Sequence, residues 1–431
     1  MLDRPFDPET RTVSRTDRPA VLERSFDICV VGSGASGASA AIEAARAGRR
    51  VILMDGLPAL GGQAVNSIIG MFCGLYTPGK NGRQLTHGIA DEILRDLGTT
   101  GEVKIVPGGA MKVAMYNEVA LGRWIETTVL AEGVTPLTGA IIRKVNREGR
   151  RVTSLEAATR HGDVRISAAG FIDATGDAAL TWEAGFECRV HKHGQIYGSQ
   201  MIVIEDFDEA RKPSWDEMAA RIFARGEHYG MMRRDGFVAA FPGRNVAIVN
   251  MTHIETPLDP FEAAVKQIDG KEQADRTLVF LRHEFPEAFG RARIRAYGLP
   301  GVRQTRWIVG THHLTTAEVR AATQFEDAIA RCSWPLEQHH NKEGYVWEVF
   351  PDDHVHTIPL GSLTVAGADN LCAVGRCIDA DSTALSSVRV MGPCIAMGAA
   401  AAHALDLAGN GSVHGIDVRA LRARIRDNLE N

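Results

Sequence analysis

The 431-residue sequence lacks the features that mark several classes of protein. It has no uninterrupted apolar stretch of about 18 residues, so we expect no membrane span. Its 48 basic and 53 acidic residues nearly balance, and a net charge of −5 does not favour binding to nucleic acid or to an anionic membrane. The seven cysteines are scattered without a C-x-x-C pair, which argues against an iron–sulfur cluster, a zinc site or a disulfide framework. These absences favour a globular protein of the reducing cytoplasm, for which we expect no metal.

The sequence does contain a glycine pattern near its start. An apolar run over residues 26–31 predicts a strand, and a second run over 51–54 predicts another. Between them Gly32, Gly34 and Gly37 have the spacing G-x-G-x-x-G and are followed by a helix of small residues. A strand, a glycine turn, a helix and a second strand in this order predict a dinucleotide-binding unit. A chance glycine-rich turn is the alternative.

Each glycine of this pattern has its own physical role. Gly32 permits the tight turn, Gly34 lets the backbone approach a pyrophosphate, and Gly37 lets helix and strand pack closely. Ala35 and Ser36 lie where the helix begins, and free N–H groups there favour a phosphate.

Further residues along the chain favour FAD as the dinucleotide. Asp55 ends the second strand, where its carboxylate is placed to accept hydrogen bonds from an adenosine ribose. Gly61, Gly62 and Gln63 follow, where the pyrophosphate and ribityl chain of a flavin would pass. The chain has no second strand–glycine–helix unit, so one dinucleotide has an obvious site. The late segment 370–380 reads as a buried strand that ends in a glycine and a polar turn.

Four ordered blocks give the chain a family resemblance. They are VGSGASGASAAIEAARAG with Asp55, LGGQAVNSIIGMFCGLYTPG at 60–79, GFIDATGDAAL at 170–180, and NLCAVGRCIDADSTALSSVRVMGPCIAMGAAAAHAL at 370–405. With these blocks the chain resembles the FAD-dependent oxidoreductases of the glutathione-reductase superfamily, in the branch related to succinate dehydrogenase and fumarate reductase flavoproteins. Residues 190–365 match this family only loosely, so the resemblance implies chemistry without a substrate.

The resemblance implies an α/β fold with a Rossmann-like FAD-binding domain, formed by a parallel sheet with a β-meander, and an inserted α+β substrate domain. It also implies that Asp177 lies near the adenosine half of FAD, and that Gly375 and Arg376 lie along the ribityl chain.

The last block supports a flavin contact on physical grounds as well. Arg389, Val390 and Met391 lead into a small-residue helix predicted over 394–407. N–H groups at the start of this helix would stabilise negative charge at the flavin N1/O2 edge. A plain buried helix packed on a sheet is the alternative and explains the alanines equally well.

The same reasoning predicts how the chain is divided. We expect an N-terminal arm at 1–24, a discontinuous FAD-binding domain at 25–75, 130–185 and 365–431, and a substrate domain at 76–129 and 186–364. Turn residues predict a β-meander over 136–164, and apolar periodicity predicts helices over 214–224, 260–285 and 316–332.

Two arginines and a cysteine are candidates for contact with substrate or flavin. Arg303 and Arg306 would point to opposite faces of a strand, so one could reach the flavin site and anchor an anionic substrate group. Gln304 stands where the family more often has an acid, so a neat arginine–carboxylate pair is in doubt. Either arginine could instead form a structural ion pair. Cys73 could contact the flavin or serve as a small buried hydrophobe.

Histidines are the candidate bases. His312 and His356 are the first two choices, followed by His313, because imidazole can take a proton while hydride leaves to flavin N5. A surface or core role is the alternative for each.

No module for a nicotinamide is apparent, so electrons should enter from an organic substrate. We expect FAD-dependent oxidation of a small polar metabolite by hydride transfer to N5, by a dehydrogenase or an oxidase, with oxygen, a quinone or a protein as acceptor. A fumarate-reductase-like alkene reductase and a flavoprotein subunit that passes electrons to a partner stay open, as does a homo-oligomer.

Overall fold

The computed structural model describes residues 10, 12, 14, 21–79, 81–108, 111–191, 196–241 and 244–430. Its largest sheet has the strand order β6-β2-β1-β9-β8-β7, and β20 also pairs with β9. These strands are β1 (Leu22–Val31), β2 (Val51–Met54), β6 (Thr135–Leu137), β7 (Ile141–Glu148), β8 (Arg151–Thr159), β9 (Gly162–Asp173) and β20 (Leu371–Ala373).

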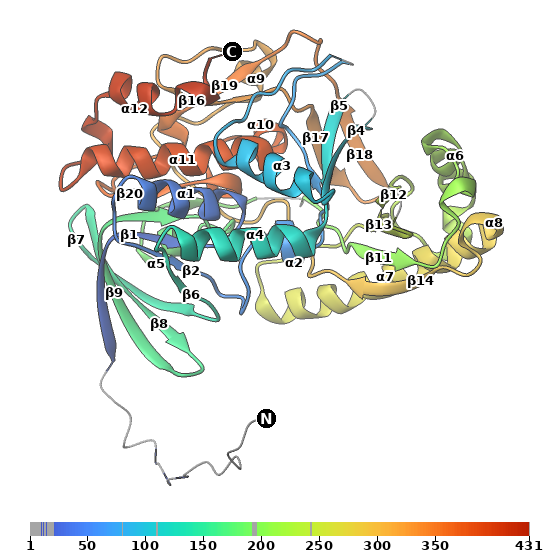
Figure 1. Cartoon of the computed structure of the whole chain (residues 1–431), viewed down its shortest axis with the longest axis horizontal. Helices are drawn as coiled ribbons and strands as arrows, with labels where there is room; N and C mark the ends of the chain where they lie inside the picture. Colours follow the sequence, from blue (N-terminus) through green and yellow to red (C-terminus); the bar gives the residue numbers. More distant parts are fainter. Residues whose placement is uncertain are drawn as a thin grey trace.

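The sheet combines parallel pairing with an antiparallel meander. β1 pairs in parallel with β2 and β9, and β20 pairs in parallel with β9. The hairpins β7-β8 and β8-β9 are antiparallel and form the predicted meander, visible at the lower left of Figure 1. This mixed sheet with its helices confirms the α/β fold class.

Alternation along β1 assigns its two faces to different cores. Ile28 and Val30 are buried among the helices, whereas Cys29 and Val31 are buried with residues of the meander. This is the period of two that a fully buried strand requires, and it explains why the run is apolar throughout.

Helices α1 (Ala35–Arg46) and α11 (Met391–Ala408) lie side by side over the sheet (Figure 1). A Cβ added to Gly398 of α11 would lie 2.1 Å from the Ser36 carbonyl oxygen, so the two backbones approach too closely for a side chain there. The Ser39 hydroxyl also donates to the Ile395 carbonyl oxygen at 2.8 Å. The small residues of both helices are therefore explained by their mutual packing.

The remaining elements surround this unit. The other helices are α2 (Gly62–Asn66), α3 (Ile89–Thr99), α4 (Glu118–Ala131), α5 (Ala179–Glu183), α6 (Trp215–Arg225), α7 (Pro260–Glu284), α8 (Pro286–Phe289), α9 (Thr316–Arg320), α10 (Ser382–Val388) and α12 (Val418–Arg424). A four-stranded antiparallel sheet contains β11 (Ile202–Glu205), β12 (Phe237–Phe241), β13 (Val246–Asn250) and β14 (Arg293–Tyr297). Helices α6 and α8 lie beside it at the end of the molecule opposite α12, and α7 runs toward them from below the middle of the molecule (Figure 1).

Smaller sheets complete the fold. They comprise β3 (Met71–Phe72), β4 (Val103–Gly108) and β5 (Met111–Tyr116); β10 (Cys188–Arg189) with β15 (Trp307–Ile308); β16 (Ala328–Cys332) with β19 (His356–Pro359); and β17 (Leu336–Asn341) with β18 (Gly344–Glu348). Helices α3 and α4, from the segment 76–129, share a core cluster with α1. The division into two domains stays a prediction.

The helix expected over 316–332 is wrong. Helix α9 ends at Arg320, Ala322 has a φ of +52°, and Ala328–Cys332 is a fully buried strand paired with β19. A short apolar run fits a strand as well as a helix, and here the available partner strand decides. The helices expected over 214–224 and 260–285 are confirmed as α6 and α7.

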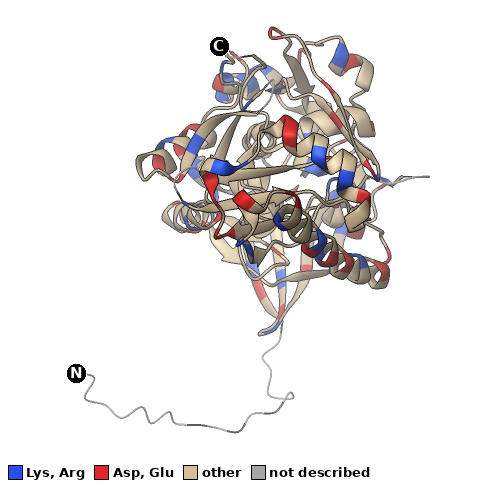
Figure 2. Ribbon diagram, turned by 90° about the vertical axis from the view of Figure 1, so that its right-hand side faces the viewer, with Lys and Arg blue, Asp and Glu red and all other residues tan. Residues whose placement is uncertain are grey.

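Among the described residues, α11 is the one helix long and apolar enough to cross a bilayer, and 72% of it is buried inside the molecule. Burial in the core accounts for its composition. Basic and acidic residues are interspersed along the elements that Figure 2 shows.

Asn370 joins the β20 segment to the sheet and should be important for stability. Its amide nitrogen donates to the carbonyl oxygens of Val152 and Ala169, both at 2.8 Å, and its oxygen accepts from the Val152 N–H at 2.9 Å. Because the side chain is buried, Asn370→Ala removes a partner from three backbone groups, and among the described residues only the Ala169 carbonyl oxygen keeps another side-chain donor, Arg151 at 3.3 Å. We expect a loss of about 2–4 kcal/mol in the free energy of unfolding, measured by urea titration. Exposed Asn341 provides the control, and equal losses for both alanine variants would contradict the assignment.

Candidate functional site

The glycine turn has the geometry that close backbone approach requires. Gly32 has a φ of +100°, and an added Cβ would lie 2.2 Å from the Ala174 carbonyl oxygen. A Cβ on Gly37 would lie 1.8 Å from the Gly32 carbonyl oxygen. A Cβ on Gly34 meets no protein atom within 4 Å. Gly32 and Gly37 are therefore demanded by packing within the protein, whereas Gly34 faces open space at the start of α1.

Asp55 organises the turn from the end of β2. Its Oδ2 accepts hydrogen bonds from the Ser33 N–H at 2.7 Å and the Ser33 hydroxyl at 2.6 Å, and its Oδ1 accepts from the Leu57 N–H at 2.8 Å. The Gly61 N–H donates to the Ser33 carbonyl oxygen at 3.1 Å. Asp55 therefore also ties the glycine turn to the loop after β2, a role that the sequence reasoning missed.

Two later segments meet the start of α1. A Cβ on Gly62 would lie 2.7 Å from the Gly34 Cα, and a Cβ on Gly375 would lie 2.7 Å from the Ser36 hydroxyl. The N-cap residue Gly34 supplies no side-chain cap to α1, so Ala35 and Ser36 begin a helix without a side-chain acceptor. The structure thus gathers the predicted cofactor residues of three distant segments around one helix end.

Arg376, next to Gly375, lies near this helix end. It packs over Gly176, its Nη1 is 3.7 Å from Asp177 Oδ1, and Nη1 has no hydrogen-bond partner although it is buried. Asp177 Oδ1 also accepts from the Thr305 hydroxyl at 2.5 Å. A buried guanidinium nitrogen without a partner fits an anionic or carbonyl group of a bound molecule.

A cavity of about 780 Å³ continues from this point. Seven residues singled out from the sequence line it: Gln63, Cys73, Arg303, Arg376, Arg389, Val390 and Met391. Val390 is the N-cap of α11 and supplies no side-chain cap, so this helix start is also without a side-chain acceptor. The Gly392 N–H donates to the Cys73 carbonyl oxygen at 2.9 Å and fixes α11 against the loop that carries Cys73.

Arginines give the cavity an excess of positive charge, and two of them, Arg303 and Arg389, are half-buried. Arg303 donates to the Tyr197 carbonyl oxygen at 2.6 Å and to the Ser199 hydroxyl at 3.0 Å, both uncharged groups. Burial lowers the pKa of Arg303 well below its usual value, and Arg389 lowers it further. Burial also lowers the pKa of Arg389, against the opposing effect of Glu337. Within the described parts of the chain, neither Arg303 nor Arg389 has a carboxylate oxygen within 4.0 Å.

Glu337 on β17 also lines the cavity, and the sequence analysis missed it. Its Oε2 accepts from the Trp334 indole N–H at 3.0 Å, and its Oε1 lies 2.8 Å from His339 Nε2. Glu337 and His339 are two residues apart on one strand and so share a face. The spacing Glu-x-His in an alternating strand was the signal available from the sequence.

The predicted histidine bases lie elsewhere. His312 Nε2 is 3.1 Å from Glu318, and His313 Nδ1 is 2.6 Å from Asp379. His356 is buried, its Nδ1 lies 3.0 Å from His354 Nε2, and burial lowers its pKa to about 3. None of the three lines the cavity, so their catalytic role stays a prediction without support from this geometry.

Arg306 diverges from Arg303, although the segment between them is not the strand that was expected. Its guanidinium lies 4.5 Å from the Trp182 ring centre and donates to the Asp177 carbonyl oxygen at 3.4 Å. Arg303 therefore faces the cavity, whereas Arg306 does not line it.

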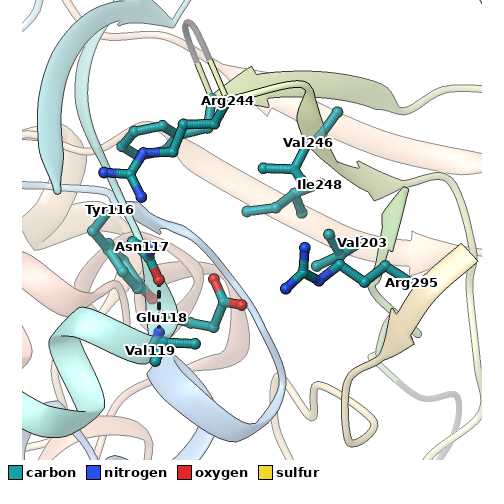
Figure 3. A pocket seen from close by; sticks show the side chains of 11 residues that line it. Tyr116, Asn117, Glu118, Val119, Val203, Arg244, Val246, Ile248 and Arg295 are labelled. Carbon is teal, nitrogen blue, oxygen red and sulfur yellow. Dashed lines mark hydrogen bonds between the residues drawn. The ribbon is translucent and has the colours of Figure 1, made fainter. Parts of the chain in front are cut away.

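A second hollow of about 390 Å³ lies between the start of α4 and the four-stranded sheet (Figure 3). Glu118 and Arg295 point toward one another across it, and Asn117 caps α4 by accepting from the Val119 N–H at 2.9 Å. Arg244 pairs with Glu102 at 2.6 Å, and Arg295 lies 3.5 Å from Glu205. Both of its arginines thus have carboxylate partners, and no predicted site residue lines it.

Thiol chemistry and metal binding receive no support from the described residues. Burial raises the pKa of the Cys73 thiol, which keeps it protonated, and all seven cysteines are free. In the described ranges, no three His, Cys, Asp or Glu side chains come together as a metal site.

Comparison with known proteins identifies the family. Residues 27–425 match the family model described as FAD dependent oxidoreductase, so the chain belongs to that family and is an FAD-dependent oxidoreductase. No curated protein matches the chain.

Solved structures resemble this fold at low sequence identity. A geranylgeranyl bacteriochlorophyll reductase-like protein from Thermoplasma acidophilum has a TM-score of 0.49 at 13% identity, over 94% of this chain and 83% of the other. A flavin-dependent brominase has a TM-score of 0.46 at 14% identity, over 94% and 83%. A myxobacterial chondrochloren halogenase has a TM-score of 0.46 at 13% identity, over 93% and 78%. At this level the likenesses carry no argument about substrate.

The residues present fit FAD. Gly34 leaves open space against the N-terminus of α1, as a pyrophosphate needs, and Arg376 presents an unpartnered buried nitrogen nearby. Gly34 at the start of α1 would meet the pyrophosphate, Gly32, Gly37 and Gly62 shape the turn around it, and Val390 and Met391 would meet the flavin end.

Gly34→Val tests this placement. Gly34 has a φ of −64° and open space at its Cβ, so valine should leave the fold intact while it fills the pyrophosphate position. We expect FAD occupancy after dialysis to fall at least tenfold, measured from absorbance. Gly415→Val is the matched control, because a Cβ there also meets no protein atom within 4 Å. Full FAD retention by both variants would place the cofactor elsewhere.

Proposed function

We propose that this FAD-dependent oxidoreductase oxidises a small, anionic, polar metabolite bound in the cavity lined by Arg303, Arg389 and Glu337. Bound FAD supplies the chemistry by accepting hydride at N5. The protein's own residues bind the substrate, orient its C–H bond toward the flavin and accept the proton that the substrate loses.

The unpaired charge of Arg303 and Arg389 carries this proposal. Moving an ion out of water costs several kcal/mol even after relaxation. Glu337 offsets part of that cost for both arginines, but among the described residues no carboxylate oxygen lies within 4.0 Å of either one. Of the nearby arginines, Arg233 has its own partner in Asp235. A substrate anion would supply the missing negative charge, and the planar guanidinium groups suit a carboxylate or phosphate.

Aromatic side chains complete the walls. Trp334, Tyr345 and Trp347 line the cavity and contact one another, with ring centres 5.4 Å and 5.7 Å apart. They offer apolar surface to the carbon skeleton of a substrate and reduce its contact with water. A lower local dielectric strengthens its attraction to the arginines.

Several finer points belong to the same proposal. We place the chain in the glutathione-reductase superfamily, in the branch related to succinate dehydrogenase, and in the cytoplasm. Oxygen, a quinone or a protein would reoxidise the flavin, and a homo-oligomer is compatible with this scheme. An alkene reductase would use the same arginines, whereas an electron-passing subunit would not need a cavity with buried charge.

An anaerobic screen of metabolites for flavin bleaching tests the function directly. We expect carboxylates or phosphates that carry an alcohol, amine or saturated C–C bond to reduce the flavin without a partner protein. Reduction by neutral metabolites alone would contradict the anionic class. Oxidation of the prereduced enzyme by an unsaturated acid would instead support the alkene reductase.

Arg303→Lys should impair catalysis while it leaves the cofactor in place. Lysine keeps the charge but loses the planar pair of donors, so we expect a loss of about 1.5–3 kcal/mol, roughly a 10- to 150-fold fall in kcat/KM. The measurement is steady-state kinetics with the substrate from the screen, alongside the flavin spectrum. Arg320→Lys is the control, because Arg320 is exposed and pairs with Glu348. Unchanged kcat/KM in Arg303→Lys would remove this arginine from the site.

A further inference from the structure

Three side chains form a continuous hydrogen-bonded chain that runs from the cavity to a backbone carbonyl. His253 Nδ1 lies 2.9 Å from the Lys342 carbonyl oxygen, His253 Nε2 lies 3.0 Å from His339 Nδ1, and His339 Nε2 lies 2.8 Å from Glu337 Oε1. Both histidines are fully buried, whereas the Glu337 side chain is 20% exposed. We call this group the Glu337–His339–His253 triad.

Proton counting restricts the states of the triad. A carbonyl oxygen can only accept, so the Lys342 oxygen requires a proton on His253 Nδ1. A neutral His253 then accepts at Nε2, which requires a proton on His339 Nδ1. A neutral His339 has a bare Nε2, and it faces a carboxyl oxygen that is also bare when Glu337 is ionised. The three contacts are satisfied only when the triad holds one proton more than two neutral imidazoles and a carboxylate.

The extra proton has one route in and out. The far end of the chain is a backbone carbonyl, which cannot pass a proton on, and the histidines are buried. Glu337 is the member that lines the cavity. The triad is therefore a proton store that opens only toward the space where a substrate would lie.

Neighbouring charges make this proton labile. Burial is the largest cause that lowers the pKa of both histidines, and the positive charge of nearby arginines lowers it further in each case. The positive groups that lower the pKa of His339 are Arg303, Arg233, Arg389 and His340, and those that lower the pKa of His253 are Arg233, Arg303 and His339. The Tyr345 ring centre lies 5.3 Å from that of His339, which also contacts Glu337, and the Tyr197 ring stacks on His253 at 5.4 Å. Asp235 and Tyr345 lie beside Arg233. The cations favour the triad without its extra proton, and an anion bound to them would remove that preference.

We propose that Glu337 is the catalytic acid–base residue of the cavity, that His339 and His253 position and store its proton, and that binding of an anion makes the triad take a proton up. This rests on the proposed function. In a substrate H–C–X–H, where X is oxygen or nitrogen, the C–H hydrogen leaves with its electron pair and a C=X bond forms. The X–H proton is itself the one that the triad takes up, through Glu337. An inert anion has no such proton, so the triad then takes its proton from solvent. The electron pair is accounted for by the FAD chemistry already stated.

Proton uptake tests the triad without turnover. The oxidised holoenzyme is titrated with sulfate, and separately with oxalate, in weak buffer containing a pH indicator; both anions stay ionised near neutral pH. We expect uptake of about one proton per bound anion at some pH between about 6 and 9. The dissociation constant should correspondingly rise by up to about tenfold per pH unit as pH increases.

Two substitutions separate the proton store from mere structure. Glu337→Gln keeps the shape and can donate to His339 through its amide, but it cannot exchange a proton, so anion binding should persist without uptake. Glu318→Gln is the matched control, because Glu318 also contacts a histidine, His312, but lies outside the cavity. It should keep full uptake, and FAD absorbance reports the fold of each variant.

The outcomes distinguish the two proposals. Anion binding to the wild-type enzyme without proton uptake would overturn the triad and leave the proposed function standing. Uptake that persists in Glu337→Gln would also overturn it. If neither anion binds at a concentration of about 100 mM, which is about 100-fold above a millimolar dissociation constant, the anionic cavity is wrong and the triad proposal fails with it.

Discussion

Backbone-to-backbone contact at the start of α1 is the constraint on which the rest of the structure depends. Gly32 meets Ala174, Gly37 meets Gly32, and Gly62 meets Gly34, at distances that leave no space for a side chain. Gly375 and Gly398 approach Ser36 from the C-terminal part of the chain. Because these segments converge on one helix end, the cofactor groove and the parallel core of the sheet are built by the same contacts.

Charge is distributed differently on the two sides of that groove. At the glycine turn, the carboxylate of Asp55 is matched by three donors from Ser33 and Leu57. In the cavity, neither Arg303 nor Arg389 has a carboxylate oxygen within 4.0 Å among the described residues, although Glu337 favours the charge of both. The protein therefore satisfies the charge of Asp55 fully but that of the two arginines only in part, and an anionic ligand would supply the remaining negative charge. The Glu337–His339–His253 triad borders the same region, so an anion bound to the arginines would also change how many protons the triad holds.

Local pattern was a good guide wherever short-range geometry decides structure. The first strand, the glycine turn, the meander and the small-residue helix were predicted within a few residues, because period, turn chemistry and close packing are written in neighbouring positions. Residues 316–332 failed, because their apolar spacing fits two structures and β19, distant in sequence, selects one. Histidine numbers suggested a base, but proximity in sequence to Arg303 did not place His312 or His313 at the cavity.

The sequence by itself determined the nucleotide-binding unit, whose glycines and apolar runs lie a few residues apart, and the class of FAD-dependent oxidoreductase, which its ordered later blocks indicate. Only the tertiary structure decided which polar groups face one another. It separated Arg303 from Arg306, removed His356 into the core and joined Glu337 to His253 through His339. The physical reason is that side-chain contacts across a cavity depend on how distant strands are packed, and packing over such separations leaves no local signature in the chain.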